Sequence, residues 1–223
     1  MMRYVILFMI LLVPSLAIAQ GRITRYQDTH TIPHKSMPTK GIENGHEWVD
    51  LGLPSGVLWA TSNIGSDRES DCGTFFSWGC LATPKDNIYS IENTPTYDKD
   101  IKEYSGNPEY DAACVLWGGN WRVPTKSDYA ELVKHTICSI ANVNGITGFK
   151  LTGKNGNNIF VPYTPIKVGT TTCDDPQYRV VLWLSTPFSS RLGNTITANE
   201  KGFVIPYSTG KQSGHPIRPV MNR

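Results

Sequence analysis

The feature of the sequence that most limits the fold is one well-marked amphipathic helix in a chain otherwise made of short apolar runs. Thr125 and Asp128 form a capping-box pattern after Pro124, a pairing that satisfies free backbone N–H groups at a helix start. Apolar or β-branched residues then recur at helical spacing, at Tyr129, Leu132, Val133, Thr136 and Ile137. We therefore predict a helix over residues 126–138, and removal of the Thr125 cap is expected to cost about 1 kcal/mol.

The other segments are shorter, and most of them have the composition of strands. A short helix is expected at residues 110–117, ended by Gly118 and Gly119. Asn155 and Gly156 form a hairpin turn, because both residues tolerate positive φ. Strands are expected at residues 46–53, 57–61, 148–152, 158–163, 179–184, 195–198, 202–208 and 216–220. Two helices among many short strands predict an α+β domain.

Residues 62–110 lack a periodic pattern and are rich in Asp, Ser, Asn, Pro and Gly. We interpret them as a long irregular loop region, pinned to the core by the aromatic patch at residues 75–78. Loops of this length are uncommon inside compact domains and are more often functional than idle.

The N-terminus has the pattern of a cleavable secretory signal peptide over residues 1–19. Arg3 precedes an apolar run from Tyr4 to Val13, and small residues at Ala17 and Ala19 place cleavage before Gln20. The run is shorter than the roughly 20 apolar residues that span a bilayer, so a membrane anchor is the weaker interpretation. We expect an extended leader at residues 20–45, a folded domain at 46–223 and a secreted, periplasmic or cell-surface protein without a membrane-spanning segment in its mature chain.

The charge balance argues against two classes of partner. Removing Arg3 from the 21 basic residues leaves 20 against 19 acidic residues, a net charge of +1 with His neutral. The Lys and Arg residues are scattered rather than clustered. Nucleic acids and anionic membranes are therefore not expected as partners.

Five cysteines lie in the exported part of the chain, where disulfides can form. Cys72 and Cys80 are close enough in sequence for a local staple, whereas Cys114 and Cys138 fit helical patterns as buried free thiols. The odd number leaves at least one cysteine unpaired in a monomer, and Cys173 is the last in the chain. The sequence leaves the pairing open.

A combination of short motifs, in a fixed order, resembles the Fibrobacter succinogenes major paralogous domain family. The motifs are 46–56 (HEWVDLGLPSG), 58–60 (LWA), 110–113 (YDAA), 117–125 (WGGNWRVPT), 185–187 (STP) and 217–220 (IRPV). Members are typical of exported proteins in the Bacteroidetes. The Arg-x-Pro-Thr before the helix is also similar to the wider C-type lectin-like group, which includes formylglycine-generating-type domains and the variable proteins of diversity-generating retroelements.

This resemblance implies a C-type lectin-like fold, with small twisted antiparallel sheets, two flanking helices and long loops on one side. Its first and last strands are expected to pair. Trp117, Trp121 and Trp183 are expected to pack in the core. Arg122 and Arg218 are expected to lie within the framework, where a buried guanidinium needs an acceptor such as Asp128 or Asp111.

No complete catalytic or metal-binding constellation is found in the sequence. His135 and Cys138 are one helical turn apart, but a structural zinc needs two further ligands. Formylglycine-type chemistry in related domains depends on cysteines near the end of the domain, and none follows Cys173. The tripeptides of calcium-dependent lectins, Glu-Pro-Asn and Gln-Pro-Asp, are also missing. We therefore expect no catalytic residues, no metal and no cofactor.

The sequence interpretation favours a non-enzymatic binding or adhesion domain for an extracellular glycan or protein. Related folds display their binding surfaces on the final loops and strands. The candidate ligand-binding residues there are Phe188, Arg191, Asn194, Asn199 and Tyr207, among which Tyr and Arg are common in interfaces. The alternative is an extracellular enzyme that acts on polysaccharide or protein.

Overall fold

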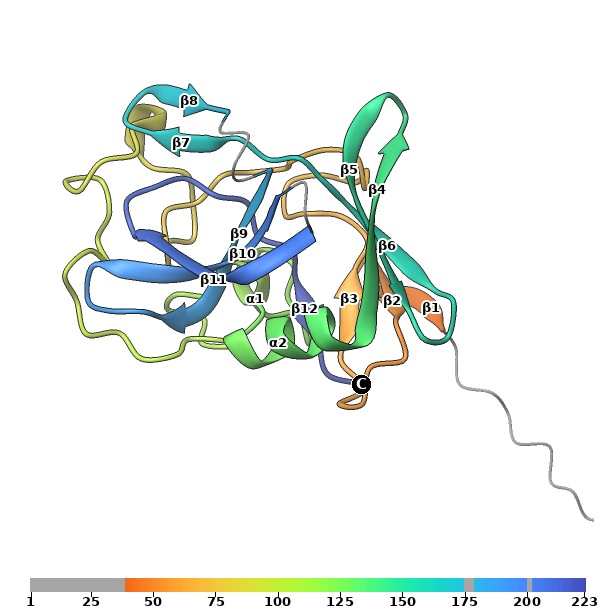
Figure 1. The fold of residues 1–223 in the computed structure, drawn as a ribbon. Coiled ribbons are helices and arrows are strands. Elements are labelled where there is room, and N and C mark those ends of the chain that lie inside the picture. The colour runs from red at the N-terminus through yellow and green to blue at the C-terminus, as the bar shows by residue number, and fades with distance from the viewer. Residues whose placement is uncertain (1–38, 175–178, 200–201) are drawn as a thin grey trace, which may run out of the picture. The chain divides into compact units, whose positions relative to one another are not determined.

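The computed structural model describes residues 39–174, 179–199 and 202–223, with residues 202–206 described by their backbone alone (Figure 1). The predicted signal peptide and residues 20–38 of the predicted leader lie outside the described residues. Within the described part, small antiparallel sheets predominate and helices are few. The predicted α+β class is confirmed at this level.

The first sheet brings the two ends of the described chain together. Its strands, in spatial order, are β1 (Lys40–Glu43), β2 (His46–Asp50), β3 (Leu58–Ala60) and β12 (Val220–Met221). β1 lies inside the segment assigned to the leader, so strand pairing begins six residues before the predicted domain start at His46. The last strand pairs with β3 rather than with the first strand. The expected pairing of the first and last strands is therefore wrong: both belong to one sheet, but they do not pair with each other.

Two further sheets have three strands each, and a small hairpin completes the set. One sheet has the order β11 (Gly202–Gly210), β10 (Leu192–Asn199), β9 (Val180–Pro187), and the other β4 (Thr136–Val143), β5 (Ile146–Gly153), β6 (Asn158–Pro162). β7 (Ile166–Val168) pairs with β8 (Thr171–Cys173). The predicted hairpin around Asn155 and Gly156 joins β5 to β6, and the predicted strands at residues 179–184, 195–198 and 202–208 are confirmed as parts of longer strands.

Both predicted helices are present; α2 begins at the predicted residue, whereas α1 begins two residues after the predicted start at Tyr110. α1 (Ala112–Leu116) is capped by Asp111, and α2 (Lys126–His135) by the capping box of Thr125 and Asp128. The prediction that α2 continues to Cys138 is wrong, because Thr136 adopts extended backbone (φ −120°, ψ 156°) and opens β4. All eight residues of β4 pair with β5. This strand pairing outweighs the helical pattern, and four of the eight residues after His135 are β-branched and so favour a strand.

Buried tryptophans dominate one of the two apolar clusters of the core. One cluster surrounds α2 and strands β5, β6 and β9, and the second contains Trp78, Trp117, Trp121 and Trp183. The last three of these are 5%, 1% and 0% exposed, which confirms the prediction that they pack in the core.

Two arginines fix the framework, each in a different way. Arg122 forms a bidentate pair with the Asp128 carboxylate at 2.6 and 3.0 Å, as predicted. Arg218 is fully buried and has no Asp partner among the described residues; it donates instead to Asn63 Oδ1 and to the carbonyl oxygens of Ala60 and Thr61. Burial lowers the pKa of Arg218 to about 9, so the guanidinium stays charged at neutral pH and ties the C-terminal segment to β3.

The segment between β3 and α1 is irregular, as predicted for residues 62–110. Its one helical turn is η1 (Lys85–Asn87), and most of the segment forms the yellow and yellow-green loops beside β7, β8 and the β9–β11 sheet (Figure 1). Phe76 and Trp78 anchor it, because the Phe76 N–H donates to His215 and the Trp78 indole donates to the Leu184 carbonyl oxygen at 2.8 Å. The predicted pinning by the aromatic patch is confirmed.

None of the five cysteines, all within the described residues, forms a disulfide in the structure. A Cys72–Cys80 staple is therefore not formed; the Cys72 thiol instead donates to the Tyr163 carbonyl oxygen at 3.3 Å. Cys114 and Cys138 are partly buried and form no disulfide, but Cys138 lies on β4 and not on a helix.

Candidate ligand-binding site

Two of the five predicted ligand-binding residues lie together at the turn between β9 and β10. Phe188 is 63% exposed there. Arg191 is also exposed and forms a bidentate contact with the Asp98 carboxylate at 3.0 and 3.1 Å. Because Asp98 belongs to the long irregular loop, this ion pair fastens the β9–β10 turn to that loop.

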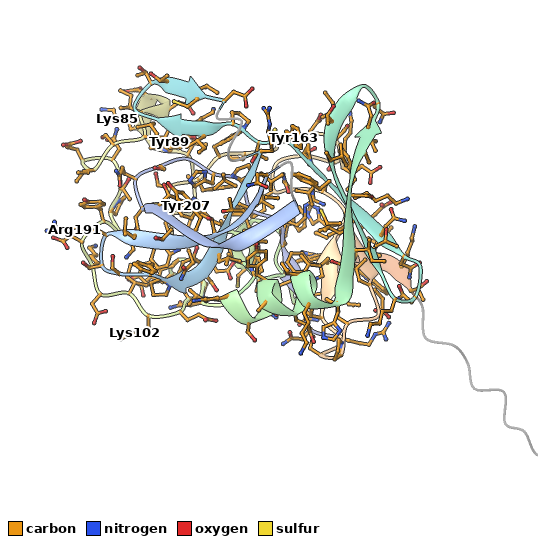
Figure 2. All side chains as sticks on the ribbon, viewed as in Figure 1. Lys85, Tyr89, Lys102, Tyr163, Arg191 and Tyr207 are labelled. Carbon is orange, nitrogen blue, oxygen red and sulfur yellow. The ribbon has the colours of Figure 1, made fainter. Side chains whose placement is uncertain are left out.

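The other three predicted residues do not join this group. Asn194 is only 3% exposed, and its side-chain amide donates to the carbonyl oxygens of Thr186 and Pro187 at 3.2 and 3.1 Å. It stabilises the hairpin and is not a surface residue, so its assignment to a binding face is wrong. Asn199 ends β10 at the opposite end from Arg191, and Tyr207 lies on β11 opposite Thr195. Figure 2 shows Arg191 at the loop end of the molecule and Tyr207 well away from it.

A cavity of about 510 Å³ lies within the long irregular loop. Its lining residues come from segments 77–85 and 93–99, together with Glu109 and Tyr110. Sites for small molecules typically enclose about 300–1,000 Å³ and combine apolar walls with a few polar groups. Lys99 lines the cavity directly after Asp98, so the Arg191–Asp98 pair holds one of its walls against the β9–β10 turn.

The loop that forms the cavity has an unusual backbone. Asp86, Asn87 and Asp98 have φ values of 54°, 56° and 57°, in the left-handed region. Asn44 and Asn144 are the other non-glycine residues with positive φ in the described part of the chain, and each precedes a glycine in a hairpin turn. Strained backbone outside such turns is concentrated at functional segments, which singles out the segment from Asp86 to Asp98.

One of the residues that line the cavity, Cys80, has a thiol of low reactivity. Cys80 is partly buried, and burial raises the pKa of its thiol above the ordinary value. Because the thiolate is the nucleophilic form of cysteine, Cys80 is poorly suited to attack a substrate at neutral pH. Thr96 also lines the cavity, and its hydroxyl donates to the Trp78 carbonyl oxygen.

Charged groups at the cavity are few. Glu109 is the carboxylate in the lining, and one of its oxygens accepts a hydrogen bond from the Tyr110 hydroxyl at 2.6 Å. Lys85 and Lys99 supply two ammonium groups. Among the residues that the structure describes, no group of three or more His, Cys, Asp or Glu side chains is placed to hold a metal ion. The His135 and Cys138 pair considered from sequence is divided between α2 and β4.

A second hollow of about 450 Å³ lies where β2 begins. The His46 ring stacks flat on Trp117, with centroids 3.8 Å apart and planes 7° from parallel. Exposed Asp67, Arg68 and Asp71 surround it. Because His46 itself covers the indole face and the charges have both signs, this hollow offers a ligand less apolar contact than the loop cavity does.

The sequence singled out the long loop as a functional candidate, which stays a prediction, but it did not predict the cavity. Tyr110 was interpreted as the start of a helix, whereas it precedes the Asp111 cap and lines the cavity. The available signal was the density of Asp, Asn, Pro and Gly around residues 83–98, a composition that allows left-handed backbone and tight turns.

Comparison of the chain with protein-family models, with curated proteins and with solved structures finds no match. The resemblance of residues 46–220 to the Fibrobacter succinogenes major paralogous domain therefore stays a hypothesis. In the described residues, no helix has the length and apolar character needed to cross a membrane.

Proposed function

We propose that the protein is an exported, non-enzymatic binding or adhesion domain. Its scaffold is C-type lectin-like, of the Fibrobacter succinogenes major paralogous kind, and its ligand is an extracellular glycan or protein. The observation that carries the proposal is the cavity of about 510 Å³ built by the long irregular loop, whose lining residue Lys99 directly follows Asp98, the partner of Arg191.

The contacts of the motif residues support this division between scaffold and ligand site. Arg122 pairs with Asp128, Arg218 holds Ala60 and Thr61, and the Ser185 N–H donates to the Pro124 carbonyl oxygen at 2.8 Å. These residues are engaged with one another across the framework. Ligand recognition therefore falls to the loop and to the adjoining β9–β10 turn.

The chemistry of the cavity favours binding over catalysis. Glycoside hydrolysis uses two carboxylates on either side of the scissile bond, whereas Glu109 is the carboxylate of this lining. The Cys80 thiol, with its raised pKa, is a poor nucleophile. Polar and apolar lining groups remain, and these suffice to orient a ligand without reacting with it.

The proposal is tested by screening the purified chain against arrays of glycans and extracellular proteins, with and without a calcium chelator. The test variant is Ala82→Trp, which places a large side chain in the cavity lining. The matched control is Asn142→Trp, on exposed β4. We expect a saturable ligand whose binding is lost in Ala82→Trp, weakened in Phe188→Ala and kept in Asn142→Trp.

Two results would contradict the proposal. The first is a ligand that binds Ala82→Trp as tightly as the unaltered chain, provided that circular dichroism shows the same fold for both. The second is release of cleaved product from any array component, which would make the protein an enzyme. A chain that binds nothing on either array would also count against a binding function.

A further inference from the structure

The charge pattern around the loop cavity is uneven. Lys85 and Lys99 line the cavity and have no ion-pair partner among the residues that the structure describes. Neither ammonium is buried, since both residues are exposed. The cavity lining thus has two ammonium groups without an ion-pair partner against one carboxylate, that of Glu109.

Neighbouring carboxylates are mostly engaged elsewhere. Asp98 accepts from Arg191 at 3.0 and 3.1 Å, and Asp100 accepts from Lys102 at 2.9 Å. The Glu109 carboxylate accepts from the Tyr110 hydroxyl. Asp98 and Asp100 are therefore compensated by other cations, and the two cavity ammonium groups outnumber the one lining carboxylate, Glu109, which favours an anionic ligand.

The walls of the cavity match the two-sided chemistry of a sugar. Leu81, Pro84 and Pro95 supply apolar surface, and Tyr110 supplies an aromatic ring. The side-chain amide of Asn93, also in the lining, can donate and accept hydrogen bonds. A pyranose ring has an apolar face and a rim of hydroxyl groups, so it can pack against the first set while it bonds to the second. An acidic peptide would bring a carboxylate but no such rim.

We propose that the loop cavity binds an acidic saccharide, a sugar that carries a carboxylate. Lys85 and Lys99 contact the carboxylate, Tyr110 and Leu81 pack against the sugar ring, and Asn93 bonds to ring hydroxyls. This inference rests on the proposed binding function and narrows it to one ligand class at one site.

The test is an NMR titration of the full mature chain with methyl glucuronide and, separately, with the matching neutral methyl glucoside. The two probes differ only at the carboxylate. We expect at least tenfold tighter binding of the glucuronide, and a weaker glucuronide affinity when NaCl rises from 50 to 500 mM, because the lysines are exposed and their charges are screened.

Two variants assign the effect to the cavity. The double variant Lys85→Gln/Lys99→Gln is expected to lose at least tenfold in glucuronide affinity. The control Lys102→Gln removes a lysine that is 82% exposed, paired with Asp100 and outside the lining, and it is expected to change the affinity less than twofold. The three substituted lysines are all exposed. An unchanged amide spectrum outside the loop confirms that the two variants are folded.

Several outcomes overturn the inference. Equal affinity for glucuronide and glucoside, or an equal loss in Lys102→Gln, removes the role of the two lysines. If an acidic dipeptide binds more tightly than the glucuronide, the ligand of the cavity is an acidic peptide and not a saccharide. If the sugars fail but another array ligand is blocked by Ala82→Trp, the binding function stands and the ligand class falls. If nothing binds, both proposals fall.

Discussion

His215 makes the folded protein sensitive to acid. Its side chain is fully buried and packs edge to face on Trp183, with centroids 4.5 Å apart and planes at 73°. Neither imidazole nitrogen has a hydrogen-bond partner among the described residues. Burial lowers the pKa of His215 to about 3, so the ring stays neutral in the folded state throughout the mildly acidic range.

The size of the effect follows from the difference in pKa between the two states. A histidine in the unfolded chain has a pKa of about 6.5. Below that pH, His215 therefore binds a proton in the unfolded state but stays unprotonated in the folded state. Above the unfolded pKa, His215 does not reduce the free energy of unfolding. Between the unfolded and the folded pKa, the free energy of unfolding falls by about 1.4 kcal/mol for each pH unit of acidification. At pH 4.5 the loss from this one residue amounts to about 3 kcal/mol.

The perturbation is His215→Phe, which keeps an aromatic ring against Trp183 and removes the titration. Urea denaturation followed by circular dichroism gives the free energy of unfolding at pH 7.0 and pH 4.5. The variant should lose about 3 kcal/mol less than the unaltered chain between these two pH values. His135→Gln serves as the control, because His135 is partly exposed at the end of α2. Equal losses in His215→Phe and the unaltered chain would refute the reasoning.

Two further stability measurements test other buried charged groups. Asp111 is buried, and its carboxylate accepts hydrogen bonds from the N–H groups of Gly106, Cys114 and Val123. In urea denaturation, Asp111→Ala should lower the free energy of unfolding by about 3 kcal/mol or more, because three donors lose their acceptor. A loss below about 1 kcal/mol would contradict this. Burial lowers the pKa of Lys211 to about 8, so the folded state releases a proton that the unfolded state keeps until about pH 10.5, and stability should rise by about 2 kcal/mol between pH 7.5 and 9.5. Lys211→Met should lack that rise, and a variant that retains it would show that another group is responsible.

Local chemistry explains which elements could be predicted from the sequence. The start of α2 depends on Thr125 and Asp128, which are three residues apart and contact each other directly. The end of α2 depends on pairing between β4 and β5, a relation to residues 146–153 that helical spacing does not register.

A turn signal that the sequence contained would have corrected two of the errors. Asn44–Gly45 and Asn144–Gly145 have the same composition as the predicted Asn155–Gly156 turn, and both pairs have positive φ at each residue. They connect β1 to β2 and β4 to β5. Applying the Asn-Gly rule at all three positions predicts β1 before His46 and a strand in place of the last turn of the helix.

The candidate site was less predictable, because proximity in sequence did not mean proximity on one face. Arg191 and Asn199 bracket β10, whose length puts them about 25 Å apart at roughly 3.3 Å per residue. Asn194 lies between them but is turned inward, where its amide bonds to the end of β9. The partner that gives Arg191 its place, Asp98, is 93 residues away.

The anchoring of the long loop explains how one chain can hold a fixed framework and a specialised cavity. Before the cavity segment, Trp78 is locked by its bond to Leu184; after it, Asp111 joins the loop end at Gly106 to α1 and to Val123 of the motif segment. Residues 81–99 lie between these two anchors, and the Arg191–Asp98 pair adds a third fastening. Substitutions within that stretch can change the ligand contacts while the bonds that position the loop stay intact. Under the proposed binding function, ligand specificity would be set in a part of the chain whose changes the framework tolerates.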